Sequence, residues 1–206
     1  RVLHSGGWRV ATHAVGDAAI DLVLDAYEAA DAEFPIAPAR WVIEHGFIPR
    51  NDQFPRMRDL GLAVSVQDHL YLAAPSLIEY WGQERAAWTT PVRAYLDAGI
   101  PLSLGTDSPV VPYDPWWVLH HFTTRETISA GVVGADQRIS REEALRSATE
   151  GYAYLTFSEQ DRGSLGVGKL ADFAVTAEDY FACEDPCLET MLIDITVVGG
   201  RIVWER

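Results

Sequence analysis

Three side chains that can bind a divalent metal stand at the ends of short apolar runs. His13 ends the run WRVATH, His45 ends RWVIEH, and Asp107 ends IPLSLGTD. His45 follows His13 by 32 positions, and Asp107 follows His45 by 62. A (β/α)8 barrel of about 250 residues uses about 31 residues for each strand and its helix. The spacing therefore predicts ligands at the ends of strands n, n+1 and n+3 of one barrel.

Two imidazoles and a carboxylate suit zinc or a similar divalent ion, with an open position for water. Such an ion lowers the pKa of the bound water to about 7, and a carboxylate beside it can take the proton. The chemistry predicted for this edge is hydrolysis, with one or two divalent ions and zinc as the first candidate. A single histidine at a strand end is more commonly one that forms a hydrogen bond with a neighbouring backbone group. The prediction therefore rests on the repetition of a metal-binding residue at three strand ends, and not on His13 alone.

The elements that must position these residues alternate between strands and helices. Apolar runs predict strands over 8–13, 40–45, 62–67 and 100–107. Helical periodicity and caps predict helices over 17–30, 52–60 and 90–98, one from Asp114, and one after Ser140, which precedes Glu143 at a capping-box spacing. The long segment between Gln67 and residue 90 reads as a loop that forms a lid or pocket wall. Alternating strands and helices favour an α/β fold with a parallel sheet or part of a barrel.

The sequence pattern changes after Gly163. Short strands follow, with a hairpin signal at Gly199 and Gly200 and no helical period, which indicates a small β appendage. The two cysteines, Cys183 and Cys187, are too few for a disulfide scaffold and are interpreted as free thiols.

Charge and hydropathy exclude several classes of protein. The 206 residues are 48% apolar and carry a formal net charge of −14, so the chain can bury a core and repels nucleic acid. No apolar run reaches the roughly 20 residues that a membrane span needs, and no signal-peptide pattern opens the sequence. We therefore expect a cytoplasmic protein that binds a small-molecule substrate and neither nucleic acid nor membrane.

Several of these motifs together resemble a known family. THAVGD, IEHG, GTDSPV, SREEALRSAT and GSLGVGKLADFAV resemble the C-terminal half of the amidohydrolase superfamily. Within it, the motifs most resemble the amidohydrolase-3 type, which includes N-substituted formamide deformylase-like enzymes. The resemblance implies the C-terminal half of a (β/α)8 TIM-like barrel over 1–160, followed by strands of a small β-sandwich domain over 161–206.

The resemblance also implies roles for individual residues. His13 and His45 match the metal-binding histidines that end strands 5 and 6. Asp107 matches the strand 8 aspartate, which binds metal, takes a proton from the attacking water and passes it to the leaving amine. The implied reaction is hydrolysis of an amide, formamide or related non-peptide C–N bond. The family's strand 1 H-x-H pair and its strand 4 ligand have no counterpart here, and Asp68 and His69 follow Gln67 where the branch commonly has proline.

Further residues are candidates for secondary roles. Asp17 is expected to cap the helix that follows it and to orient His13 from behind. Four residues are candidates for contact with substrate, although His69 is more readily interpreted as an exposed loop histidine and at least one tryptophan as packing: Gln67, His69, Tyr113 and Trp116.

Two other functions stay open at this point. Four strand–helix units cannot close a barrel, so the chain could be a catalytically incomplete half-barrel with a structural or oligomerisation role. Its open sheet edges would then meet a missing N-terminal segment or a second copy of the chain. Alternatively, the same scaffold could act on an ester, lactone, phosphoester or deamination substrate, because the fold does not select the bond.

Overall fold

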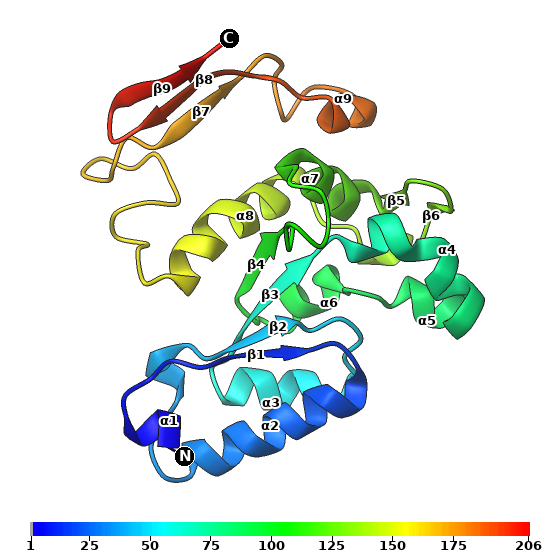
Figure 1. The fold of residues 1–206 in the computed structure, drawn as a ribbon, viewed down its shortest axis with the longest axis vertical. Coiled ribbons are helices and arrows are strands. Elements are labelled where there is room, and N and C mark those ends of the chain that lie inside the picture. The colour runs from blue at the N-terminus through cyan, green and yellow to red at the C-terminus, as the bar shows by residue number, and fades with distance from the viewer. Residues whose placement is uncertain (1) are drawn as a thin grey trace.

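Four parallel strands form the central sheet of the computed structural model, which describes residues 2–206. The strands are β1 (Ala11–Ala14), β2 (Val42–His45), β3 (Ala63–Gln67) and β4 (Leu102–Gly105), in the spatial order β1-β2-β3-β4 (Figure 1). Each strand lies beside its neighbour in sequence, as in the wall of a barrel, whereas a doubly wound sheet reverses its order. The predicted α/β fold with part of a barrel is confirmed.

Helices cover one face of this sheet. α2 (Asp17–Asp31) and α3 (Gln53–Asp59) follow β1 and β2, and α6 (Val92–Asp97) directly precedes β4. α2 and α3 lie along β1 and β2 (Figure 1). Their apolar residues share one buried cluster with strand residues such as Ile43 and Val64, both fully buried. The main hydrophobic core therefore lies between these helices and the sheet, and it holds the strands that carry the site.

The segment after β3 is helical, so the prediction of a loop there is wrong. α4 (His69–Trp81) and α5 (Gln83–Ala87) fill it, and Tyr71 and Trp81 lie on α4. Pro75 inside α4 cannot donate to the carbonyl of Tyr71 four residues earlier. The backbone N–H of Ile128 bonds that carbonyl instead, at 3.0 Å. A contact with a residue distant in the sequence thus compensates for the hydrogen bond that Pro75 cannot make.

Two longer helices, α7 and α8, follow β4, the last strand of the parallel sheet. α7 (Pro115–Thr124) is capped by Asp114, whose carboxylate accepts the N–H of Trp116, and β5 (Glu126–Thr127) and β6 (Gly131–Val132) form a short hairpin after it. α8 (Arg141–Leu155) begins with the predicted capping box of Ser140 and Glu143. It packs along β4 so tightly that a Cβ on Gly151 would lie 2.1 Å from the carbonyl oxygen of Leu102.

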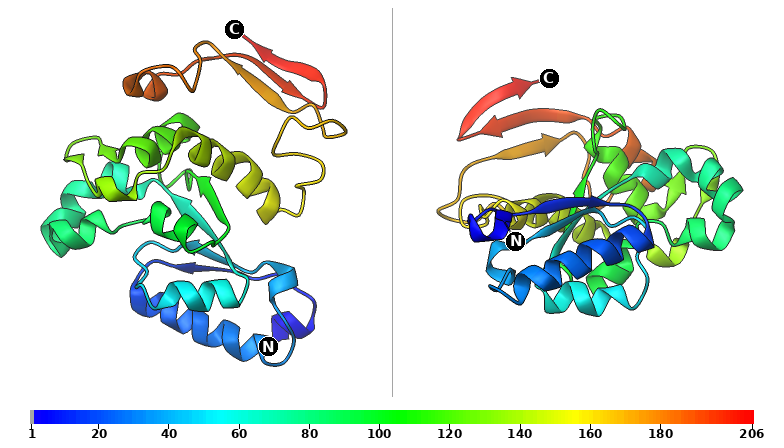
Figure 2. Two further views of the ribbon diagram at one scale, coloured as in Figure 1. Left: turned by 180° about the vertical axis from the view of Figure 1, so that it is seen from behind. Right: turned by 60° about the horizontal axis from the view of Figure 1, so that its bottom comes forward.

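The C-terminal part is a three-stranded antiparallel sheet in the order β7-β8-β9: β7 (Phe173–Thr176), β8 (Ile193–Val198) and β9 (Arg201–Glu205). The predicted hairpin turn is present, with φ of 58° at Gly199 and 76° at Gly200. A short helix that the sequence did not predict, α9 (Asp185–Glu189), interrupts the strands. Figure 2 shows that this sheet lies beyond α8, on the side away from α2 and α3.

Three short helices complete the elements: α1 (Val2–Ser5), η1 (Ala37–Ala39) and η2 (Ala135–Gln137). Across residues 2–206, every helix is too short or too polar to cross a membrane.

Candidate metal centre

The carboxyl ends of three neighbouring strands bring together two imidazoles and one carboxylate. His45, His69 and Asp107 each offer a ligand atom, and these atoms all lie within 4.8 Å of one another. Nε2 of His69 is 3.1 Å from Oδ2 of Asp107, and the ring centroids of His45 and His69 are 5.5 Å apart. Imidazole nitrogen and carboxylate oxygen are donors that zinc and similar cations accept. The residues present therefore fit a divalent cation.

His13 lies at the same sheet edge, beside this group. Its ring centroid is 4.5 Å from that of His45, and the two rings meet edge to face at 78°. The predicted ligands thus lie at one edge of the sheet, with His13 near the end of β1, His45 at the end of β2 and Asp107 after β4. The compact group of three ligand atoms, however, contains His69 in the place predicted for His13.

The backbone is left-handed at two of these residues. φ is 73° at His45 and 60° at Asp107. Few residues other than glycine adopt this region, and those that do concentrate at functional sites. In a regular strand His45 would share the face of Ile43, which packs against the helices. The left-handed conformation ends β2 at His45, so the imidazole does not have to point to the same face as Ile43.

The residue after His45 supports this turn. Gly46 also has a positive φ, and a Cβ there would lie 2.5 Å from the hydroxyl oxygen of Tyr95. That hydroxyl, on α6, donates to the carbonyl of Gly46 at 2.7 Å, and burial raises the pKa of Tyr95. The sharp strand end is therefore fixed by a buried hydrogen bond from the neighbouring helix.

His69 is the residue whose place the sequence described least well. It is the first residue of α4, its side chain is 21% exposed, and it contacts Asp107. Burial lowers the pKa of His69, and the hydrogen bond to Asp107 opposes that shift only in part. A half-buried neutral imidazole replaces the exposed loop histidine that was the alternative interpretation. The signal available in the sequence was its position two residues after a strand end.

Gln67 contacts His45 directly. Its Oε1 lies 2.5 Å from Nδ1 of His45, and its amide nitrogen lies 3.0 Å from Oγ of Ser65. The side chain is 5% exposed. The structure thus places Gln67, predicted as a substrate contact, behind the ring of His45.

The structure places Asp17 one residue inside the helix that it was predicted to cap. Gly16 is the N-cap of α2, and Asp17 is the first helical residue, with Oδ1 accepting the N–H of Ala18 at 2.9 Å. Oδ2 of Asp17 pairs with Arg85 of α5 at 3.5 Å. Among the contacts of residues 2–206, none joins the Asp17 carboxylate to His13. The carboxylate is directed toward an arginine on the neighbouring helix instead.

The aromatic candidates lie apart from the cluster or in solvent. Tyr113 is 83% exposed in the loop after β4. Trp116 packs against Tyr180, with ring centroids 6.2 Å apart, and lines a groove between α8 and the β7–β9 sheet. The ring of Trp116 thus packs toward the C-terminal sheet, and its contact with substrate stays a prediction.

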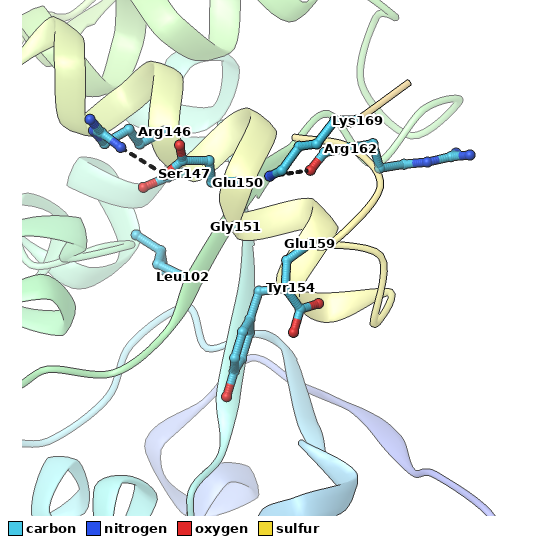
Figure 3. A pocket seen from close by; sticks show the side chains of 9 residues that line it. All are labelled: Leu102, Arg146, Ser147, Glu150, Gly151, Tyr154, Glu159, Arg162 and Lys169. Carbon is cyan, nitrogen blue, oxygen red and sulfur yellow. Dashed lines mark hydrogen bonds and ion pairs between the residues drawn. The ribbon is translucent and has the colours of Figure 1, made fainter. Parts of the chain in front are cut away.

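A charged pocket at the other end of β4 is a separate feature. Figure 3 shows Arg146 paired with Glu150, and Lys169 bonded to the carbonyl of Arg162, around the first residue of β4, Leu102. This is the amino end of the strand, whereas Asp107 follows its carboxyl end. Barrel enzymes build their active sites at the carboxyl ends of the strands. The histidine and aspartate cluster is therefore the candidate site.

Known proteins resemble this chain in sequence and in fold over most of its length. The model of the Amidohydrolase family matches residues 1–204. N-substituted formamide deformylase of Arthrobacter pascens is 32% identical over 97% of this chain, which spans 37% of that enzyme's length. The structure of a metal-dependent hydrolase from Pyrococcus horikoshii is 30% identical, with a TM-score of 0.75 over 89% of this chain and 36% of that one. A metal-dependent hydrolase from Pyrococcus furiosus is 36% identical, with a TM-score of 0.64 over 79% of this chain and 32% of that one. The chain belongs to the amidohydrolase family.

Proposed function

We propose that this chain forms part of the active site of a hydrolase that uses a divalent metal to cleave a C–N bond in a small molecule. The observation that carries the proposal is the group of His45, His69 and Asp107 within 4.8 Å, with His13 against His45. The similarity to a formamide deformylase over 97% of the chain supports formamides and related amides as the substrate class.

His13, His45 and Asp107 would hold the cation, and zinc is the first ion to test because two imidazoles and a carboxylate are ligands it accepts. Bound there, the cation would lower the pKa of a water molecule and polarise the substrate carbonyl. Asp107 is the proton acceptor: its side chain is 34% exposed, so it can reach solvent and substrate. It takes a proton from the attacking water and returns it to the leaving nitrogen. His69 holds Oδ2 of that carboxylate in place.

Under this proposal the chain has two parts. Residues 1–160 contribute the barrel part that carries the site, and residues 161–206 contribute strands of a β-sandwich. Within residues 2–206, β1 and β4 each pair with a strand on one side only. A further segment of protein or a second copy of the chain would complete the sheet.

Metal analysis of the purified chain tests the proposal. We expect about one zinc ion per chain by plasma mass spectrometry after loading and desalting, and its loss in the double variant His13→Ala/His45→Ala. His4→Ala is the matched control, since His4 is bonded to the carbonyl of Phe34 far from the cluster. Chains that bind metal are then assayed for formate release from N-substituted formamides. Absence of bound metal in the unsubstituted chain would contradict the proposal and favour a structural half-barrel.

A further inference from the structure

The contact between Gln67 and His45 fixes more than the position of a ring. Nδ1 of His45 and Oε1 of Gln67 are 2.5 Å apart, and both side chains are at least nine-tenths buried. Water is therefore a poor competitor for this hydrogen bond. Which atom carries the proton is decided by the orientation of the Gln67 amide.

Ser65 sets that orientation. The amide nitrogen of Gln67 faces Ser65, 3.0 Å from Oγ and 3.4 Å from the backbone oxygen. A backbone carbonyl only accepts hydrogen bonds, so the group that faces it must be the donor, the amide NH₂. The opposite end of the amide, which faces His45, is then the carbonyl oxygen. Because Oε1 has no hydrogen to donate, Nδ1 of His45 must supply it.

A neutral imidazole carries a single N–H, so a hydrogen on Nδ1 leaves Nε2 with a free lone pair. We infer that Ser65 and Gln67 hold His45 in the Nδ1–H tautomer, which presents Nε2 as the ligand atom. Gln67 is thus a positioning residue that acts through His45. The tautomer itself follows from the contacts of Gln67 with Ser65 and His45, whereas its use in metal binding rests on the proposed function.

Tautomers are measured directly, without metal or activity. In a long-range ¹H–¹⁵N spectrum of the metal-free 206-residue chain, recorded above the pH range in which imidazole is protonated, we expect His45 with a protonated Nδ1. His45→Gln identifies the signals by removing them. Gln67→Leu removes the acceptor and is expected to shift His45 toward Nε2–H, whereas Gln67→Glu keeps an acceptor and is expected to retain Nδ1–H.

A wild-type spectrum with the hydrogen on Nε2 would overturn the inference, and so would an unchanged tautomer in a folded Gln67→Leu variant. The wild-type spectrum alone decides the first point, so the inference stays open to refutation even if the variant does not fold.

Zinc affinity then tests the consequence. By competition with a chromophoric chelator, we expect Gln67→Leu to bind zinc about 10- to 100-fold more weakly, as for other losses of a ligand's hydrogen-bond partner. Gln67→Glu is expected to stay close to the wild type, as is the control Gln83→Leu at the start of α5. A confirmed tautomer with no zinc bound by any variant would overturn the proposed metal site and leave the assignment of His45 intact. Equal zinc affinity in wild type and Gln67→Leu would overturn the role of Gln67 in metal binding.

Discussion

Nε2 of His69 lies 3.1 Å from Oδ2 of Asp107, so the first residue of α4 reaches the carboxylate that follows β4. Burial keeps the pKa of this imidazole below its ordinary value. It is therefore neutral near neutral pH and donates Nε2–H to Asp107. A neutral donor fixes the carboxylate without cancelling its charge, which leaves the other oxygen able to bind a cation or accept a proton.

Replacement of Asp107 by asparagine tests its role as the proton acceptor. In the complete enzyme that contains this chain, we expect Asp107→Asn to lower kcat by about 10²- to 10⁴-fold, the usual contribution of general acid–base catalysis. Asp59→Asn removes an exposed carboxylate that pairs with Arg58 and serves as the control. Retention of more than about a tenth of the activity in Asp107→Asn would show that another group takes the proton.

Asp68 is expected to destabilise the fold at neutral and higher pH. Burial raises its pKa to about 7 from an ordinary value of 3.8, and its Oδ1 has no hydrogen-bond partner among the described residues. The unfolded carboxyl loses its proton first as pH rises, so the free energy of unfolding falls between pH 3.8 and about 7. Asp68→Asn removes this penalty. In the metal-free chain it should raise the free energy of unfolding by about 1–3 kcal/mol near pH 8 and by much less near pH 4.

Urea unfolding at the two pH values measures this difference. Asp97→Asn, on the exposed face of α6, is the control for loss of a carboxylate. An equal effect of Asp68→Asn at both pH values would mean that the buried carboxyl does not titrate as described.

His121 has the opposite effect on acid stability. It is fully buried, and burial lowers its pKa to about 3 from 6.5, with Arg125 adding to the shift. As pH falls below 6.5 the unfolded chain binds a proton that the folded chain excludes, so the free energy of unfolding falls by about 1.4 kcal/mol per pH unit. His121→Asn keeps an N–H for the carbonyl of Glu126, which Nδ1 contacts at 2.8 Å, and does not titrate. The difference in free energy of unfolding between the wild type and His121→Asn should therefore shrink between about pH 6 and pH 4. A constant difference over that range would mean that the pKa of His121 is not lowered by burial.

The parts of the molecule that followed from the sequence are those set by local signals. Short apolar runs predicted the end of β2 at His45 and the end of β1 to within one residue of His13, and Ser140 and Glu143 predicted the start of α8. Repetition of a polar residue at strand ends, at the spacing of barrel units, then places the candidate ligands on one edge. Neither step needs a contact between distant residues.

The parts that did not follow depend on distant contacts. Helix α4 tolerates Pro75 because Ile128, from the β5–β6 hairpin, bonds the carbonyl that the proline leaves free. His69 joins the cluster because α4 begins directly at the strand end, which a loop would not require. Asp17 turns to Arg85 on a helix that was not predicted. The helices α4 and α5, the place of His69 in the cluster and the partner of Asp17 therefore depend on contacts that the local sequence pattern does not show.

The close packing of α8 on β4 depends on a single glycine. A Cβ at Gly151 would lie 2.1 Å from the carbonyl oxygen of Leu102 and 3.2 Å from its carbon, which are backbone atoms that cannot rotate away. Gly151→Ala should lower the free energy of unfolding by about 1–3 kcal/mol despite the better helix propensity of alanine, since overpacking costs about that much. Gly166→Ala is the control, because its Cβ would meet only the side chain of Lys169 at 3.6 Å. Equal thermal stability of the two variants would show that α8 can shift away from the strand.

The C-terminal sheet is expected to mediate self-association of the isolated chain. β9 pairs with β8 alone in the part of the chain that the structure describes, and Ile202, Val203 and Trp204 on it are 46–60% exposed. An apolar edge strand with free N–H and C=O groups is a template for pairing with another chain, and an inward or edge lysine is a common protection against it. Sedimentation velocity should therefore show a mass above the 22.8 kDa monomer that increases with protein concentration. Ile202→Lys should shift the chain toward monomer, whereas Leu22→Lys, which replaces an exposed leucine on α2, should not. A wild-type chain that stays monomeric at all concentrations would show that this edge does not pair.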